Sequence, residues 1–406
     1  MNNWETVELG EIVKLGGGKI HTGPFGSQLH ASDYVEQGIP CIMPANMVNN
    51  RVDVSSIAMI SEADAERLSK YIVFEGDIVY SRRGDVTLKA LIREQESGYF
   101  CGTGCLLLRP GSKVDSEFLT YYLSTDTMKW WIRQQAVGAT MPNLNTGILA
   151  RIPFRAPSKE EQSALARVIS SLDKKIELNN KINAELEAMA KLIYDYWFVQ
   201  FDFPDVNGKP YKSSGGKMVF NEELQREIPE GWQATTLGAI CDLYQPKTIS
   251  EKEMDENGKY LVYGANGVVG KYSQFNHEKS VVTITCRGNS CGTLNTTRPF
   301  SWITGNAMVV NNKCETMHVE FIHNMLSWSN LDAVISGSAQ PQITRTNLAP
   351  LRLLLPPKSI LAEYNKTISS NFEKRLILAN ENDQLISLRD WLLPMLMNGQ
   401  VTISTK

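Results

Sequence analysis

The stretch SKEEQSALARVISSLDKKIELNNKINAELEAMAKLIYDYWFV, from Ser158 to Val199, decides the fold of this chain. It contains neither Pro nor Gly, so nothing in it interrupts a helix. At 1.5 Å per residue such a helix would be about 60 Å long, and its apolar stripe needs a partner. The stripe recurs at three- and four-residue steps, which is typical of one helix face: Leu165, Ile169, Leu172, Ile176, Ile182, Leu186, Met189, Ile193 and Trp197.

A second copy of this pattern lies near the end of the same chain. The segment PPKSILAEYNKTISSNFEKRLILANENDQL, 356–385, matches the first at a displacement of 199 residues, with Ile169 on Ile368 and Leu186 on Leu385. Two unrelated amphipathic helices would explain either stripe alone. Whether the helices are copies of each other therefore depends on whether the repeat extends beyond them. The second stripe is Leu361, Tyr364, Ile368, Phe372, Leu376, Leu385, Leu388 and Leu392.

The repeat extends over the rest of the chain. NWETVELGEIVKLGGGK near the N-terminus matches GWQATTLGAICDLYQPK at a displacement of 228, which places Lys19 on Lys247. YSRRGDVTLK matches TITCRGNSCGTLN, and GATMPNLNTGILARIPF matches GSAQPQITRTNLAPLRL, at displacements of 204 and 199. The chain is therefore a tandem duplication of a globular unit plus a long helix. The symmetry of such a duplication predicts an antiparallel helix pair with a pseudo-two-fold axis.

The globular units read as mixed α+β. Short β-rich runs alternate with Gly, Asn and Pro turns, whereas 61–71 and 115–136 have helical patterns. A hairpin is predicted around Asn266-Gly267. We expect two tandem α/β domains separated by two long antiparallel helices. The predicted boundaries are 1–156 and 229–355 for the domains, 157–203 and 356–406 for the helical spacers, and 204–228 for a polar linker.

Composition narrows the function classes. The 406 residues carry a net charge of −3, which argues against indiscriminate nucleic-acid binding but allows a local basic surface. There is no membrane-spanning run and no leader pattern, so we expect a cytoplasmic protein. The seven Cys include Cys101-x3-Cys105 and Cys286-x4-Cys291, but the five scattered His complete no zinc site. We therefore expect neither a metal nor another cofactor on this chain.

The chain lacks recognisable catalytic motifs. No Asn-Pro-Pro-aromatic or Asp-Pro-Pro-aromatic methyltransferase tetrapeptide occurs, and SSGGK at Ser213 lacks the spacing of a phosphate loop. Gly16-Gly17-Gly18 lacks the later glycine of a dinucleotide fingerprint and is better explained as a turn. The chain is thus expected to bind rather than to catalyse.

Several motifs in this layout resemble one family. The sequences LIYDYWFVQFDFP, NGKPYKSSGG, IPEGW, GANGVVGKY followed by RGNSCGT, and TGPFGSQL are similar to those of the specificity subunit of a Type I restriction-modification enzyme. The resemblance implies two target-recognition domains, each reading one half of a split double-stranded DNA target. It also implies that the paired helices set the spacing and dock two methyltransferase subunits. S-adenosylmethionine, ATP and Mg would then be used by the methyltransferase and restriction subunits.

Base reading requires Arg, Lys, Asn or Gln on rigid turns, with Gly allowing close backbone approach. Matched turns of the two copies carry such residues, although each one alone could equally be a solvated turn residue. The candidate DNA contacts are Arg82, Arg83, Lys89, Ser27 and Gln28 in the first copy, and Lys271, Arg287 and Asn289 in the second.

Two other functions remain open at this point. The chain could be the recognition module of a single-chain modification or restriction enzyme, although the methyltransferase and nuclease motifs are missing. It could also be a coiled-coil scaffold that binds only proteins, which the long helices allow but the duplicated basic turns do not require.

Overall fold

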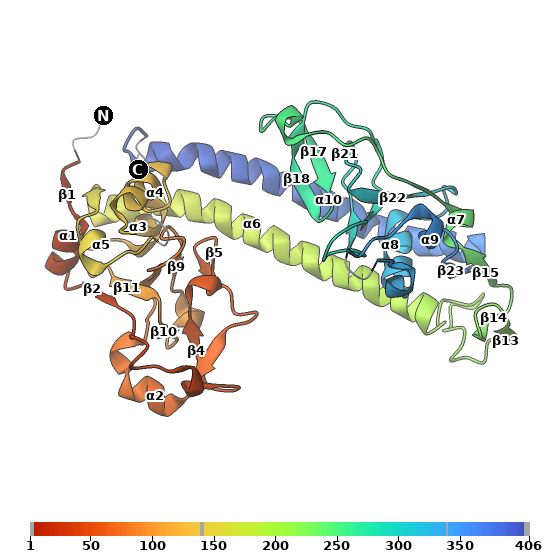
Figure 1. The fold of residues 1–406 in the computed structure, drawn as a ribbon, viewed down its shortest axis with the longest axis horizontal. Helices are drawn as coiled ribbons and strands as arrows, with labels where there is room; N and C mark the ends of the chain where they lie inside the picture. Colours follow the sequence, from red (N-terminus) through yellow and green to blue (C-terminus); the bar gives the residue numbers. More distant parts are fainter. Residues whose placement is uncertain (1–3, 139–141, 338–339, 402–406) are drawn as a thin grey trace. The chain divides into compact units, whose positions relative to one another are not determined.

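The computed structural model describes residues 4–138, 142–337 and 340–401 (Figure 1). The chain forms two compact units. Unit 1 comprises Met1–Glu177 together with Asn382–Lys406, and unit 2 comprises Leu178–Glu381. Each unit thus contains one globular domain and a part of both predicted helical spacers, and the division into five consecutive segments remains a prediction.

Two long helices carry the apolar stripes. Helix α6 covers Lys159–Tyr194 and continues as a π-helical turn over Asp195–Val199, and helix α10 covers Lys358–Met397. Pro394 lies inside α10 at the position equivalent to Asp195, where α6 changes to its π-helical turn.

Within each unit the two helical segments pack antiparallel. In unit 2 the Asn179 side chain of α6 donates to Glu381 of α10 at 2.7 Å, and farther along α6 Glu187 lies 3.1 Å from Arg375. In unit 1 Arg389 of α10 lies 3.1 Å from Asp173 of α6. Residue numbers therefore rise along α6 while they fall along α10. The antiparallel helix pair and the α+β fold class predicted from the sequence are confirmed.

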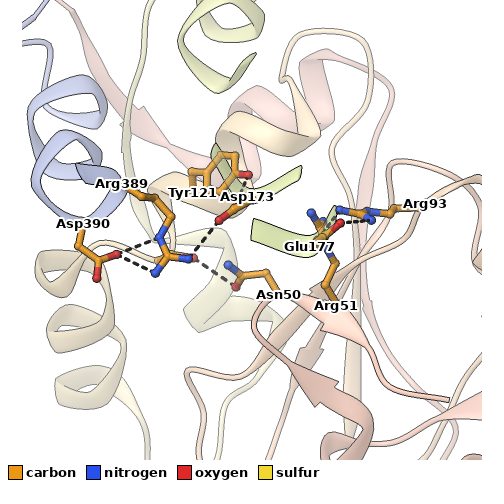
Figure 2. A network of polar contacts seen from close by, with 9 residues as sticks. Asn50, Arg51, Arg93, Tyr121, Asp173, Glu177, Arg389 and Asp390 are labelled. Carbon is orange, nitrogen blue, oxygen red and sulfur yellow. Dashed lines mark hydrogen bonds and ion pairs between the residues drawn. The ribbon is translucent and has the colours of Figure 1, made fainter. Parts of the chain in front are cut away.

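Polar contacts attach the first domain to α6 (Figure 2). Glu177 accepts hydrogen bonds from Arg51 at 2.8 Å and from both terminal nitrogens of Arg93 at 3.1 and 3.2 Å. One turn earlier, Asp173 accepts from the Tyr121 hydroxyl at 2.7 Å. Charged pairs held by several hydrogen bonds are geometrically specific, so this network fixes the domain on the helix.

The domain of unit 1 contains two four-stranded sheets and two short strand pairs. One sheet is antiparallel throughout, and the other joins β10 and β4 in parallel. The first sheet has the order β2 (Lys19–Thr22), β11 (Cys105–Arg109), β8 (Ile78–Ser81), β9 (Lys89–Leu91). The second has the order β10 (Phe100–Cys101), β4 (Ile39–Ile42), β7 (Ala58–Ile60), β3 (Tyr34–Val35). The remaining elements are β1 (Thr6–Glu8) with β12 (Pro153–Arg155), β5 (Met47–Val48) with β6 (Arg51–Val52), α1 (Leu9–Leu15), α2 (Glu62–Arg67), α3 (Ser116–Tyr122), α4 (Asp126–Gln135) and α5 (Thr146–Ala150).

The domain of unit 2 repeats this topology in a shorter form. Its antiparallel sheet has the order β16 (Cys241–Tyr244), β22 (Ala307–Asn312), β19 (Val282–Thr285), β20 (Leu294–Thr296). Its mixed sheet has the order β18 (Gly267–Tyr272), β17 (Tyr260–Gly264), β21 (Trp302–Ile303), with β17 and β21 parallel. The remaining elements are β15 (Gln233–Thr236) with β23 (Arg352–Leu355), β13 (Met218–Asn221) with β14 (Arg226–Pro229), α7 (Leu237–Ile240), α8 (Val319–Ser327) and α9 (Arg345–Leu348).

A close backbone approach recurs in both copies. A Cβ on Gly10 would lie 2.7 Å from the Ala150 Cβ, and one on Gly238 would lie 3.0 Å from the Ala349 Cβ. The adjoining amides, of Leu9 in one copy and of Leu237 in the other, each donate to a carbonyl of the facing segment at 2.9 Å. These contacts join the start of each domain to its end, which confirms the duplication in three dimensions.

Three expectations about local structure are wrong. The single helix predicted over 115–136 is two helices, because Thr125 ends one segment and caps α4 with its hydroxyl. The short β-rich runs at 100–110 and 300–310 do not form one strand each, because each divides into two strands that belong to different sheets. Strand registers place Lys19 at the position of Asp242, not Lys247, because α7 is shorter than α1.

The predicted linker is folded. It contains β13 and most of β14, and Tyr211 stacks on Phe203 with ring centroids 4.7 Å apart. Phe203 in turn contacts Trp232, so the segment packs on aromatic residues that follow α6. None of the helices in the described residues is both long and apolar enough to cross a membrane.

The Gly10 contact predicts a loss of stability on substitution. Gly10→Ala should lower the free energy of unfolding by about 1–3 kcal/mol, because the added methyl overpacks against Ala150 despite the better helix propensity of Ala. Gly238→Ala should cost less, since its contact is longer. Urea unfolding followed by tryptophan fluorescence measures both. Gly26→Ala is the control, because no atom lies within 4 Å of its added methyl; equal midpoints for Gly10→Ala and Gly26→Ala would contradict the expectation.

Candidate nucleic-acid interface

Each domain presents a basic turn beside a second loop. We call 82–85 and 287–290 the arginine turns, and 138–142 and 337–341 the proline loops. In unit 1 Arg83 forms a β-bridge with Asn143, and in unit 2 Arg287 forms one with Gln342. The structure thus brings together two segments that are separate in the sequence, and it does so identically in both copies.

The proline loops are closed by reciprocal backbone hydrogen bonds. Val137 and Asn143 exchange two bonds of 3.1 and 2.9 Å, and Ser336 and Gln342 exchange two of 2.9 and 2.8 Å. Residues 139–141 and 338–339 of these loops lie outside the described part of the chain. The closing bonds hold the base of each loop against the arginine turn.

Glycine is required in both arginine turns. Gly84 has φ of 76° and Gly288 has φ of 85°, a left-handed conformation that side-chain-bearing residues rarely adopt. Arg83, Arg287 and Asn289 are exposed. None of the three forms an ion pair with a described residue, so their side chains are available for an external ligand.

The loop carrying Ser27 and Gln28 lies beside the first arginine turn. The Arg82 guanidinium stacks over the exposed ring of Phe25, 5.5 Å from its centroid. Ser27 is exposed. The side-chain oxygen Oε1 of Gln28 accepts hydrogen bonds from the Phe25 backbone amide at 3.1 Å and from the Tyr71 hydroxyl at 3.0 Å. The side-chain oxygen of Gln28 therefore holds this loop in position.

Lys89 lies apart from the other candidates. It is in β9 opposite Tyr80, and only 3% of it is exposed. Burial, together with the charge of nearby Lys129, lowers the pKa of Lys89 to about 7, and Asp85 partly opposes this shift. A buried strand residue cannot reach DNA in this conformation, so we remove Lys89 from the candidate contacts.

Lys271 has a different setting from the arginine turns. It lies exposed on β18, after a hairpin whose two turn residues are Ala265 and Asn266, one residue earlier than predicted. The hairpin is anchored where the Thr285 hydroxyl donates to the Ala265 carbonyl. Lys271 lines a cavity of about 780 Å³ together with Glu251, Asp255 and Glu256, whose carboxylates would repel a phosphate.

Sequence reasoning missed Asn143, Gln342 and Phe25. The first two lie in segments already aligned as repeats, so a search for polar residues that directly follow both proline loops could have found them. Phe25 lacked such a signal, because its contact with Arg82 depends on tertiary structure.

Among the described residues there is no group of three or more potential metal ligands, and burial raises the pKa of the Cys41 thiol to about 12.

The family described as "Type I restriction modification DNA specificity domain" matches residues 1–188 and 229–386. The chain is 25% identical to the MjaIX specificity subunit of a type I restriction enzyme from Methanocaldococcus jannaschii, over 99% of this chain and 94% of that protein. It is 21% identical to the HindI specificity subunit from Haemophilus influenzae, over 99% and 100%. Its fold resembles that of a type I restriction-modification S subunit from M. genitalium, with a TM-score of 0.59, 18% identity and coverage of 100% and 98%.

The buried Lys89 predicts a pH-dependent stability. Its pKa is about 7 in the folded protein and near 10.5 when unperturbed, so the unfolded chain binds more protons between these values and stability rises with pH across that window. Lys89→Met should therefore be more stable than the unsubstituted protein at pH 7, with a difference that shrinks toward pH 10. Urea midpoints at several pH values measure this. Parallel curves for the two proteins would contradict it, and Lys14→Met, at an exposed lysine, is the control.

Proposed function

The chain belongs to the Type I restriction modification DNA specificity family, and we propose that it reads a bipartite DNA target with one half-site for each of its two domains. The duplicated arginine turns and proline loops carry this proposal. They place uncommitted Arg83, Arg287 and Asn289 side chains on glycine turns with a fixed backbone. Arg pairs with guanine and Asn with adenine in the major groove, so such turns suit base reading.

The two long helices would set the distance between the half-sites. Both α6 and α10 run without a break through the boundary between the units, at Glu177–Leu178 and Glu381–Asn382. Each domain is also attached to its helical segments, by Asp173 and Glu177 in unit 1 and by Arg375 in unit 2. A continuous helix has a fixed rise per residue, which is what a spacer of defined length requires.

The chain would act as a targeting subunit without catalysis of its own. S-adenosylmethionine would then be used by methyltransferase subunits, and ATP and Mg by restriction subunits, with DNA bound by the assembled complex. The absence of methyltransferase and nuclease motifs from the sequence supports this division of labour. It also favours this role over a single-chain enzyme module.

The methyltransferase subunits would dock on duplicated apolar positions of the helices. Met189 and Leu192 of α6 are 49% and 66% exposed, and their repeat equivalents Leu388 and Trp391 of α10 are 43% and 58% exposed. Leu178 and Ile377 form a third exposed pair. Exposed apolar residues at helical spacing mark protein contacts. Because the same positions recur on both helices, two copies of one partner are the fitting occupants, which a scaffold for unrelated proteins would not require.

Independent half-sites predict separable defects. Arg83→Ala should relax the sequence preference at one half-site only, and Arg287→Ala at the other, each costing about 1–3 kcal/mol where the arginine makes a bidentate base contact. Methylation-site sequencing of cells expressing each variant with its methyltransferase and restriction partners measures both preferences. Asp85→Ala, in the same turn as Arg83, is the matched control. A single variant that altered both half-sites would refute independent reading.

Duplicated docking predicts a stepwise loss of partners. The unsubstituted chain should bind two methyltransferase subunits, Leu192→Glu or Trp391→Glu should bind one, and the double variant none, because a buried unpaired carboxylate opposes each contact. Native mass spectrometry counts the subunits. Lys191→Glu changes charge about 100° around the helix from Leu192 and should still bind two. Two partners retained by both single variants would rule out this surface.

A further inference from the structure

A cavity of about 270 Å³ lies in the domain of unit 1, next to the first arginine turn. It is built from two separate parts of the chain: β2 with the loop that follows it, and the short helix Ser69–Tyr71. The side chains that give the cavity its chemistry are Lys19, His21, Phe25, Gln28, Lys70 and Tyr71.

The amide of Gln28 has a defined orientation. Its oxygen accepts hydrogen bonds from the Phe25 amide and from the Tyr71 hydroxyl, so its nitrogen is the end that remains for a ligand. That nitrogen makes no hydrogen bond with any residue in the described ranges. The cavity wall therefore includes a preoriented donor of two hydrogen bonds.

The cavity also carries uncompensated positive charge. Lys19 and Lys70 form no ion pair with a described residue, and the Lys70 ammonium lies 4.7 Å from the Tyr71 ring centroid. Nearby Asp77 is already held by Arg109 through bonds of 2.7 and 2.6 Å, which offsets the charge of that carboxylate. The net local charge favours an anion.

His21 contributes an unused nitrogen. Its Nδ1–H donates to the Thr22 carbonyl at 3.1 Å, while its Nε2 is buried and has no hydrogen-bond partner among the described residues. Burial is the main cause that lowers the pKa of His21, and Lys19 and Arg109 add to the effect. Protonated next to an anion, this ring would donate a further hydrogen bond.

From the cavity, its two unpaired lysines and the oriented amide, we infer that it binds a backbone phosphate of the DNA at the half-site read by unit 1. This inference rests on the proposed function and adds a positioning contact to it. Phosphates protrude from the duplex and can enter a concave site, and ammonium and amide N–H groups are their usual donors. Phosphate contacts fix the register of a protein on DNA without carrying sequence information.

Phe25 connects the cavity to the first arginine turn. It is part of the cavity wall, and its ring also stacks with the guanidinium of Arg82, the residue next to Arg83. A phosphate held in the cavity would thus set the position from which Arg83 reaches the groove.

Among the described residues, the second domain differs from the first at two of the cavity positions. At the positions of Lys19 and His21 it has Asp242 and Tyr244, and a carboxylate at the lysine position opposes phosphate binding. The phosphate contact is therefore specific to the first half-site.

The test is the salt dependence of DNA binding by the full chain assembled with its methyltransferase partner. The double variant Lys19→Gln and Lys70→Gln should reduce the slope of log Kd against log salt concentration by about 1, as expected for one lost phosphate contact, and leave the sequence preference unchanged. The control pair Lys14→Gln and Lys113→Gln removes two exposed lysines of the same unit that do not line the cavity, and should leave the slope nearly unchanged. Fluorescence anisotropy with cognate and scrambled duplexes gives both quantities.

The possible outcomes separate the two proposals. An unchanged slope in the cavity variant, or an equal fall of the slope in the control pair, would overturn the phosphate site. The proposed function would still be supported in that case by specific DNA binding of the unsubstituted complex. Absence of specific binding by the unsubstituted complex would overturn both. Free inorganic phosphate is the alternative ligand to a DNA backbone phosphate. Calorimetric titration of the DNA-free protein with inorganic phosphate is expected to show no heat of binding. Saturable binding that the double variant lacks would assign the cavity to the free ion and refute its assignment to DNA.

Discussion

The structure depends on the burial of apolar residues from both long helices that neither helix can bury alone. In unit 1 Leu165 and Ile169 of α6 share a core with Leu396 and Met397 of α10. In unit 2 the roles are exchanged, and Tyr364 of α10 packs on Phe198 with ring centroids 4.9 Å apart. Each fully buried side chain of this kind contributes about 1.5–3 kcal/mol. Each domain is therefore completed by the start of its own helix and by the end of the other.

The positions of the arginine turns depend on this packing, because main-chain contacts connect the turns to the rest of each domain. In both copies a glycine lies against an alanine, and the resulting strand pairs, β1–β12 and β15–β23, join the start of a domain to its end. The proline loop precedes that returning strand, and the residue directly after the loop, Asn143 or Gln342, forms a β-bridge with the arginine turn. The turns are thus held by main-chain hydrogen bonds, which leaves their side chains free to differ between the two copies without disturbing the scaffold.

Periodicity and self-similarity were sufficient to predict the duplication, the antiparallel helices and the α+β class, because repeats and stripes are properties of the sequence itself. They failed where tertiary contacts decide. The pattern at 115–136 is continuous, yet the Thr125 hydroxyl caps a new helix there. Lys89 looks like a turn lysine, but its strand turns it inward beside Tyr80. Lys19 was aligned with Lys247 because sequence matching could not detect that α7 is shorter than α1. Whether the remaining candidates touch DNA is a prediction, since contact residues leave no periodic signal.

The completion of unit 1 by the C-terminal segment has a consequence for the order of events during synthesis. A ribosome releases residues 1–177 long before it reaches Leu396, Met397 and Gly399, the last of which lies against Trp4. The domain of unit 1 can thus close its core only after the whole of unit 2 has been synthesised. Until then part of its apolar surface stays open. A nascent chain of this design is exposed to aggregation while unit 2 is being made, and a stop codon before Leu396 would damage a domain far upstream of it.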